Sequence, residues 1–260
     1  METKNDYAVC CIPVSPMRLE PSHRSEMVSQ QLFGEPCLII ERGKDHWVKV
    51  KAHYDGYEGW CQDGHVTTID EEQYFAHGHE LTADWINELE YNGKKMIVPF
   101  GSSLPALNNG KRNWKNNIVQ FNGTRWNFDV ITPNEDAIHD IAFRFLNTSY
   151  LWGGKSIFGI DCSGFTQTVY KFLQVTLPRD AYQQADVGEA LGFLQEARCG
   201  DLAFFDNAEG RITHVGILLS DHEIIHSSVK VRVDKIDNQG IINQDTFERT
   251  HRLRIIKRYF

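Results

Sequence analysis

The chain has 260 residues, which is long enough for two or three domains, and its 41% hydrophobic and 24% charged residues are typical of a globular protein. A formal net charge of −8, with no basic run, argues against nucleic acid or an anionic membrane as the main partner. No apolar stretch approaches the ~20 residues that a membrane span requires.

The six cysteines show neither a regular disulfide framework nor a C-x-x-C zinc spacing, which favours a reducing compartment. The apolar stretch Ala8–Val14 is short, follows an acidic residue and is interrupted by Pro13, so it fits a strand better than a secretory signal. We therefore predict a cytoplasmic protein. An exported or periplasmic protein whose signal had been removed would leave the same sequence.

Short strand patterns separated by turn residues fill residues 1–68. The candidate strands are Tyr7–Val14, Glu35–Arg42, Trp47–Ala52 and Gly59–Gln62. The pieces MRLEPSHRSEMVSQQLFGEP and HWVKVKAHYDGYEGW resemble a bacterial SH3 domain. This resemblance implies a small barrel with Trp47, Val48 and Val50 in its core.

Residues 69–131 combine two patterns. The first, up to about residue 92, is acidic and compatible with a helix that places Trp85, Ile86 and Leu89 on one face, so it predicts a packed helical connector. Strand patterns return from residue 94, where IVPFGSSLPAL loosely resembles CIPVSPMRL near the start of the chain. We therefore expect a second, diverged SH3-like barrel.

The third predicted domain, residues 132–260, opens with the capping box Thr132-Pro133-Asn134-Glu135. A Gly-rich turn later leads into Asp161-Cys162-Ser163-Gly164, after which apolar residues recur at helical spacing. Cys162 is thus predicted at or just before a helix start, where free N–H groups and the helix dipole favour a thiolate and lower its pKa. A buried structural cysteine is the alternative that this local context leaves open.

Strand patterns dominate the rest of the chain, and helices followed by an antiparallel run predict an α+β domain. The candidates are Asp201–Asp206, Ile212–Leu219, Glu223–Ser228, Val231–Ile236 and Leu253–Tyr259. Two of these strands carry His214 and His226. A helix-start cysteine with a later histidine on a strand is the arrangement of a papain-like site, in which that histidine takes the thiol proton and a third polar group orients its ring.

Five short motifs in this region occur in the order DCSGF, LPR, GDLAFF, HVGI and IIHSS. Their order and spacing, over roughly the last half of the chain, resemble the NlpC-type cell-wall cysteine peptidases. The resemblance implies a papain-like catalytic domain, which the two small SH3-like barrels expected above would precede. It also implies Cys162 as nucleophile, His214 as base and His226 as the residue that orients the base.

The same resemblance implies substrate-binding residues around the nucleophile. Tyr150 is expected beside the oxyanion, and Asp161 and Ser163 are expected to bind substrate. A carboxylate at Asp161 can pair with a substrate ammonium, or it can cap the Cys162 helix, and both roles can hold at once. Arg179 either orients the site or is a surface charge.

The first domain also offers candidates. In multi-domain members of the family an SH3-like domain supplies a tyrosine to the substrate, which makes Tyr57 a candidate, with Glu26 or Glu35 as an accompanying carboxylate. The alternative for Tyr57 is a turn aromatic that packs on its own barrel.

Two histidine pairs invite a metal assignment that the sequence does not favour. His222 and His226 match the pattern H-E-x-x-H, but strand residues at this spacing lie about 13 Å apart, too far to share one zinc. His77 and His79 match no standard metal site and are interpreted as part of a solvated turn.

The resemblance predicts a peptidase that hydrolyses bacterial cell-wall stem peptides between γ-D-glutamate and a diamino acid, either L-lysine or meso-diaminopimelate. Members with N-terminal SH3-like domains favour fragments with a free N-terminal L-alanine and release L-Ala-γ-D-Glu. The reaction requires no metal or organic cofactor, and a monomer is expected. The alternatives are an amidase or acyltransferase on the same Cys-His site, or a wall-binding module whose catalytic domain is inactive.

Overall fold

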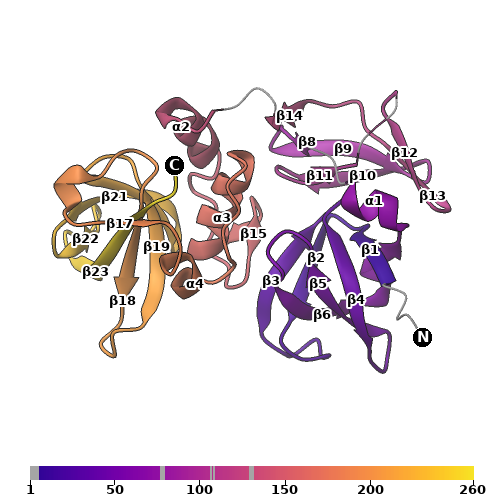
Figure 1. The fold of residues 1–260 in the computed structure, drawn as a ribbon, viewed down its shortest axis with the longest axis horizontal. Coiled ribbons are helices and arrows are strands. Elements are labelled where there is room, and N and C mark those ends of the chain that lie inside the picture. The colour runs from indigo at the N-terminus through magenta and orange to yellow at the C-terminus, as the bar shows by residue number, and fades with distance from the viewer. Residues whose placement is uncertain (1–5, 77–79, 106, 108, 129–131) are drawn as a thin grey trace. The chain divides into compact units, whose positions relative to one another are not determined.

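A computed structural model describes residues 6–76, 80–105, 107, 109–128 and 132–260 of the chain (Figure 1). The chain forms two compact units, the first of Met1–Val130 with Lys155–Ile157, and the second of Ile131–Gly154 with Phe158–Phe260. His77, His79 and the predicted boundary residue 131 lie outside the described residues. None of the described helices is long and apolar enough to cross a membrane.

The first unit begins with a seven-stranded antiparallel sheet in the order β3-β2-β6-β5-β4-β1-β7. Its strands are β1 (Asp6–Cys10), β2 (Val14–Arg18), β3 (Met27–Leu32), β4 (Pro36–Arg42), β5 (Trp47–Ala52), β6 (Glu58–Gln62) and β7 (Val66–Thr68), and a 3₁₀ turn (Asp63–His65) precedes the last of them. Alternating residues such as Met17, Val48, Val50 and Cys61 point into one buried core. The predicted burial of Trp47, Val48 and Val50 is confirmed.

Two smaller sheets complete the first unit, in the orders β10-β9-β13-β12 and β11-β8-β14. Their strands are β8 (Glu80–Thr82), β9 (Ile86–Tyr91), β10 (Lys94–Pro99), β11 (Ser103–Leu104), β12 (Lys111–Trp114), β13 (Asn117–Gln120) and β14 (Arg125–Asn127). One hydrophobic core joins Val9 and Phe33 of the first sheet region with Leu89, Val98 and Val119 of the second. The two groups of strands therefore form one compact unit.

The helical connector predicted for residues 69–92 is wrong for most of its length. Helix α1 spans only Glu71–Phe75, with Asp70 as its N-cap, and residues 86–91 form strand β9. The segment INELEY alternates between exposed and buried positions, so Leu89 is buried while Trp85 and Ile86 are exposed. This period of two fits a strand with one buried face, and it overrides the weak helical spacing of the three apolar residues.

The second unit packs helices beside a seven-stranded sheet in the order β17-β23-β18-β19-β20-β21-β22, with an additional pairing of β22 with β23 (Figure 1). The strands are β17 (Glu189–Leu191), β18 (Leu202–Asp206), β19 (Ile212–Leu218), β20 (Glu223–Ser228), β21 (Lys230–Asp237), β22 (Gly240–Ile242) and β23 (Arg249–Arg258). The helices are α2 (Glu135–Phe143), α3 (Cys162–Phe172) and α4 (Ala181–Ala185), with a 3₁₀ turn at Leu194–Glu196. The predicted α+β domain and its strands are confirmed.

Helix α2 starts two residues later than the predicted capping box implies. Its N-cap is Asn134, not Thr132, and the Asn134 side chain accepts a hydrogen bond from the Ala137 N–H at 2.9 Å. Asparagine and threonine are both good N-cap residues, so either could start the helix. Pro133 has no backbone N–H to donate, and in the structure it lies just before the N-cap.

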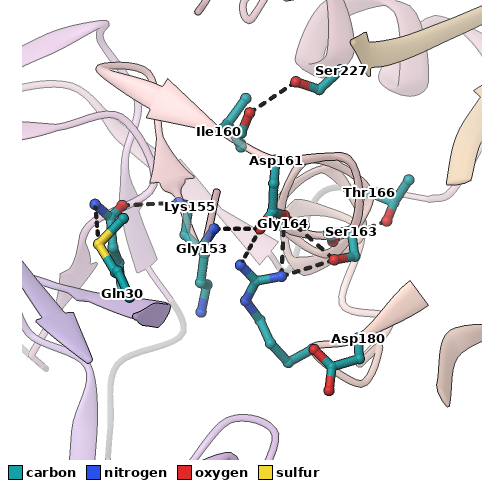
Figure 2. Close-up of polar contacts among 12 residues, drawn as sticks. Gln30, Gly153, Lys155, Ile160, Asp161, Ser163, Gly164, Thr166, Asp180 and Ser227 are labelled. Atoms are coloured by element: carbon teal, nitrogen blue, oxygen red, sulfur yellow. Dashed lines mark hydrogen bonds and ion pairs between the residues drawn. The ribbon is translucent and has the colours of Figure 1, made fainter. Parts of the chain in front are cut away.

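The segment before α3 carries two short strands, β15 (Lys155–Ser156) in the first unit and β16 (Gly159–Ile160) in the second. Within the first unit, the Lys155 N–H donates to Gln30 Oε1 at 2.9 Å, as Figure 2 shows. The Lys155 ammonium lies 3.9 Å from the Glu35 carboxylate, and both side chains are buried. This pairing holds three residues of a distant segment within the first unit.

Candidate active site

Cys162 is the first residue of α3, as predicted, and Asp161 caps this helix. Asp161 Oδ1 accepts the Gly164 N–H at 2.7 Å, and Oδ2 accepts the Gly153 N–H at 2.8 Å (Figure 2). A Cβ on Gly164 would lie 2.3 Å from the Gly154 carbonyl oxygen, so this position requires glycine. The DCSG sequence thus fixes the backbone around the sulfur through a side-chain cap and a close backbone approach.

Arg179 is buried beside this cap and is not a surface charge. Its guanidinium donates to both carboxylate oxygens of Asp161, at 2.6 and 3.1 Å, and to Ser163 Oγ at 2.8 Å. The bidentate geometry matches a planar guanidinium to a carboxylate, and it compensates both buried charges. Arg179 therefore orients the residues on either side of the nucleophile.

His214 and His226 lie on neighbouring strands, β19 and β20, and form a buried hydrogen-bonded line with a carboxylate that the sequence analysis missed. His214 Nε2 lies 2.8 Å from His226 Nδ1, and His226 Nε2 lies 3.0 Å from Asp234 Oδ2 on β21. The Arg232 guanidinium donates to the other oxygen of Asp234 at 2.9 Å. The antiparallel pairing of β20 with β21 brings Asp234 opposite Ile224, two residues from His226.

The carboxylate at the end of this line decides where the protons lie. Burial works against its charge, but hydrogen bonds from His226 and the Gln244 N–H lower the pKa of Asp234 below its usual value. An ionised Asp234 only accepts hydrogen bonds, so His226 carries a proton on Nε2 and accepts the His214 Nε2–H through Nδ1. The free lone pair of the base is then on His214 Nδ1.

The sulfur and the base are both neutral in the resting site. Burial, followed by the charge of Asp161, raises the pKa of the Cys162 thiol to about 12, although the N–H groups of Val215 and Ser163 act in the opposite direction. Burial and the neighbouring imidazoles lower the pKa of His214 well below its usual range. The predicted lowering of the thiol pKa is therefore wrong, because desolvation outweighs the helix start.

The sulfur lies close to the strand that carries the base. The backbone N–H of Val215, which directly follows His214 on β19, interacts with the Cys162 sulfur, and α3 packs against β19. Burial, and then the charges of Cys162 and Asp161, raise the pKa of the Tyr150 hydroxyl, so this group keeps its proton and can donate a hydrogen bond. The structure thus brings Tyr150 near the nucleophile, and its predicted role beside the oxyanion stays a prediction.

A third histidine, His251 on β23, also escaped the sequence analysis. Its ring stacks on His214 with a centroid distance of 4.1 Å and an interplanar angle of 27°. Burial, and then the nearby His226, lower the pKa of His251 to about 4, so it is neutral at pH 7. The stacked neutral ring covers one face of the base.

The candidates from the first domain lie in the first unit. Tyr57 packs partly buried against the core of the first sheet, and Glu26 is exposed. Glu35 is buried, where it accepts the Leu32 N–H at 3.0 Å and faces Lys155. Their contacts with substrate stay predictions.

The HEIIH segment is on a strand, as predicted. His226 is buried in the hydrogen-bonded line, whereas His222 lies on the exposed turn before β20 and pairs with Asp221 at 2.7 Å. Glu223 pairs with Lys235 at 2.7 Å. These side chains face different surroundings, so they do not form the zinc site of a helical H-E-x-x-H motif.

A helix-start cysteine, a strand histidine beside it and a buried polar line that orients this histidine define a papain-like cysteine peptidase site. The NlpC/P60 family matches residues 147–250, and the bacterial dipeptidyl-peptidase SH3 domain matches residues 17–66. These matches confirm the predicted papain-like fold with an N-terminal SH3-like domain. The SH3-like character of residues 69–131, together with the domain boundaries, stays a prediction.

Relatives match over most of the chain. Two proteins named gamma-D-glutamyl-L-lysine dipeptidyl-peptidase are 30% identical (Bacillus cereus, strain ATCC 10987; 79% of this chain, 68% of the relative) and 32% identical (Bacillus subtilis, strain 168; 76% and 71%). The crystal structure of an NlpC/P60 family protein from Bacillus cereus superposes with a TM-score of 0.81 over 97% of this chain and 99% of that one, at 23% identity. The chain belongs to the NlpC/P60 family, and it is a cysteine peptidase of that type.

Proposed function

We propose that this enzyme hydrolyses cell-wall stem peptides at the bond between γ-D-glutamate and a diamino acid, and releases L-Ala-γ-D-Glu. The main support for a hydrolytic reaction is the buried series of hydrogen bonds from His214 through His226 to Asp234, which lies beside Cys162. The relatives named gamma-D-glutamyl-L-lysine dipeptidyl-peptidase support the choice of bond.

The first chemical step joins the sulfur to the substrate carbonyl carbon. His214 Nδ1 takes the thiol proton as the sulfur attacks, because both groups are neutral at rest. His214 then becomes an imidazolium, which donates through Nε2 to His226, and the Asp234 carboxylate stabilises the charge through this second ring. Proton transfer is therefore part of the reaction.

The developing oxyanion needs hydrogen-bond donors at the same place. The backbone N–H groups at the start of α3 and the protonated Tyr150 hydroxyl are donors close to the sulfur. Collapse of the tetrahedral intermediate expels the amine of the diamino acid, which takes the proton from His214. Water, deprotonated by His214, then hydrolyses the thioester, releases the dipeptide and restores the thiol.

We propose that the preferred substrate has a free N-terminal L-alanine. The Asp161 carboxylate already accepts hydrogen bonds from Arg179, Gly153 and Gly164, so a substrate ammonium meets a carboxylate whose charge is compensated. Its contribution to amine binding is therefore electrostatic and weak, and the first domain, with Tyr57 and Glu26, is the proposed source of the remaining selectivity.

The experiment is a mass-spectrometric digest of defined peptides. We expect the purified enzyme to convert L-Ala-γ-D-Glu-L-Lys-D-Ala, or its meso-diaminopimelate counterpart, to L-Ala-γ-D-Glu, and the N-acetylated peptide to react at least about tenfold more slowly. Cys162→Ala is the inactive control. Cleavage at another bond would overturn the proposed specificity, and product that forms only with an added amine would indicate an acyltransferase.

We propose that the enzyme works as a cytoplasmic monomer on released wall fragments, because a free L-alanine amine occurs on fragments rather than on glycan-linked chains. Equal rates on intact sacculi and on short peptides would contradict this proposal. Binding to sacculi without any cleavage would indicate a wall-binding module.

A further inference from the structure

Three metal-ligating side chains lie together in the second unit, outside the catalytic residues. They are Glu135 and His139 on α2 and Cys199 in the turn before β18. A carboxylate oxygen, an imidazole nitrogen and the sulfur all lie within 4.8 Å of one another. The mechanism above uses none of these groups.

The helix itself aligns two of the three ligands. Glu135 and His139 are four residues apart, so they lie on the same face of α2, one turn from each other. The His139 ring stacks on Phe143, one further turn along the same face, with a centroid distance of 5.0 Å and an interplanar angle of 10°. This stacking holds the plane of the imidazole.

The turn that carries Cys199 is fixed from both sides. The Arg198 N–H donates to Asp201 Oδ2 at 2.7 Å, and the Gly200 N–H donates to the Leu218 carbonyl at 2.9 Å. Gly200 has a φ of +99°, and a Cβ at this position would lie 2.8 Å from Ile138 Cδ1 on α2. The turn therefore approaches α2 closely enough to bring the sulfur to the helix, and its positive φ favours glycine.

We propose that Glu135, His139 and Cys199 bind a zinc ion that connects α2 to the turn before β18. A thiolate, an imidazole and a carboxylate form a ligand set that zinc accepts with tetrahedral geometry, and a water would complete it. Zinc bonds of about 2.0–2.3 Å separate tetrahedral ligands by about 3.3–3.8 Å. The exposed Glu135 side chain can close the remaining gap by rotation about its side-chain bonds.

The charges around the sulfur support a cation rather than an additional anion. The charges of Glu135 and Asp201 both act on the Cys199 sulfur, and a cation bound there would offset them. Zinc binds cysteine as the thiolate, so binding forms the sulfur–zinc bond and releases the thiol proton to solvent.

The test uses cobalt(II) as a spectroscopic substitute for zinc, in a Cys162→Ala background that removes the catalytic thiol. We expect one equivalent of cobalt to produce a near-ultraviolet thiolate-to-metal band that zinc displaces. The band should disappear in Cys199→Ser, and affinity should fall at least tenfold in His139→Gln and in Glu135→Gln. His222→Gln is the matched control, because His222 is an exposed histidine of the same unit.

Zinc should also raise the Tm of the background protein but not that of Cys199→Ser, because only the folded state assembles the three ligands. Circular dichroism of each variant without metal checks that it is folded, and His139→Gln serves if Cys199→Ser is not. A folded protein without the cobalt band, or a band that persists in Cys199→Ser, would overturn the proposal. The readout is independent of peptidase activity, so the proposed function can fail without affecting it.

Discussion

Two aspartate–arginine pairs with buried carboxylates support the catalytic residues, and they do so in different ways. Asp161 and Arg179 hold the backbone around Cys162, because the carboxylate caps α3 and the guanidinium fixes the carboxylate. Asp234, paired with Arg232, acts on a side chain and determines which nitrogen of His226 carries the proton. The first pair thus controls where the sulfur lies, and the second controls the protonation of the base.

Removal of the reacting group of Cys162 or of His214 should have the largest effect on activity. Cys162→Ala and His214→Ala each remove a reacting atom, so we expect the rate of peptide hydrolysis to fall at least about 10³-fold. The measurement is kcat/KM on a peptide that the wild-type enzyme cleaves. Substantial activity in one of these variants would show that the reaction does not use the substituted residue, so the pair that supports this residue would have no catalytic role.

The second pair is tested by Asp234→Asn. The amide keeps the size of the side chain, but it no longer supplies the negative charge that stabilises the protonated histidines, so kcat should fall about 10²- to 10⁴-fold. Stability should change much less than activity. Asp237→Asn, on the same strand and in an exposed pair with Arg249, is the control and should retain wild-type kcat. Equal effects of the two substitutions would remove the distinction between the pairs.

The first pair is tested by Arg179→Met. This substitution leaves the Asp161 carboxylate buried without its partner, so the free energy of unfolding should fall by about 3–5 kcal/mol. Arg144→Met disrupts a partly exposed pair with Asp140 on α2 and should cost less than about 1 kcal/mol. Urea unfolding measures both. A loss at Arg179 no larger than that at Arg144 would contradict the supporting role.

The two pairs also differ in how far the sequence predicts them. The capping role of Asp161 follows from its position directly before an apolar helical pattern, so local chemistry was sufficient. Asp234 lies in VRVDKID, an ordinary strand pattern, and only the register between β20 and β21 brings it to His226. The same reason explains why His251 was missed, since its partner His214 is on a different strand.

The pKa of Cys162 could not be predicted from the sequence, and the reason is different. A helix start can be predicted locally, but the burial that raises the thiol pKa to about 12 comes from packing against β19 and neighbouring segments. Five strands of the second unit follow from the sequence because each carries apolar residues in a short or alternating run. Residues 86–91 are misassigned because Trp85, Ile86 and Leu89 fall at helical spacing, whereas the segment folds with a period of two.

The smallest expected effect concerns the ring above the base. The neighbouring His251 contributes to the low pKa of His214, so His251→Phe should move the acidic limb of kcat/KM to higher pH, by no more than about one pH unit. The wild-type limb should lie below about pH 6.5, the ordinary pKa of histidine, because activity requires neutral His214. A pH–rate profile from pH 4 to 8 measures both. An unchanged limb would show that His251 only fills space.

The same substitution should change the pH dependence of stability. The folded state holds His251 neutral down to about pH 4, whereas the unfolded chain takes up the proton near pH 6.5. Stability should therefore fall as the pH drops from about 6.5 to about 4, and the fall should be shallower in His251→Phe. Tm measured across this range tests the prediction. A steeper fall in the variant would contradict the lowered pKa.

The short return of the chain to the first unit at Lys155–Ile157 limits how this protein can be divided. A fragment that starts at residue 132 would carry Lys155 away from Glu35 and Gln30, and a fragment that stops at residue 130 would lose the ion pair between Lys155 and Glu35. Either cut breaks a folded unit rather than a linker. Each unit should therefore be less stable when it is expressed alone than when it is part of the full chain.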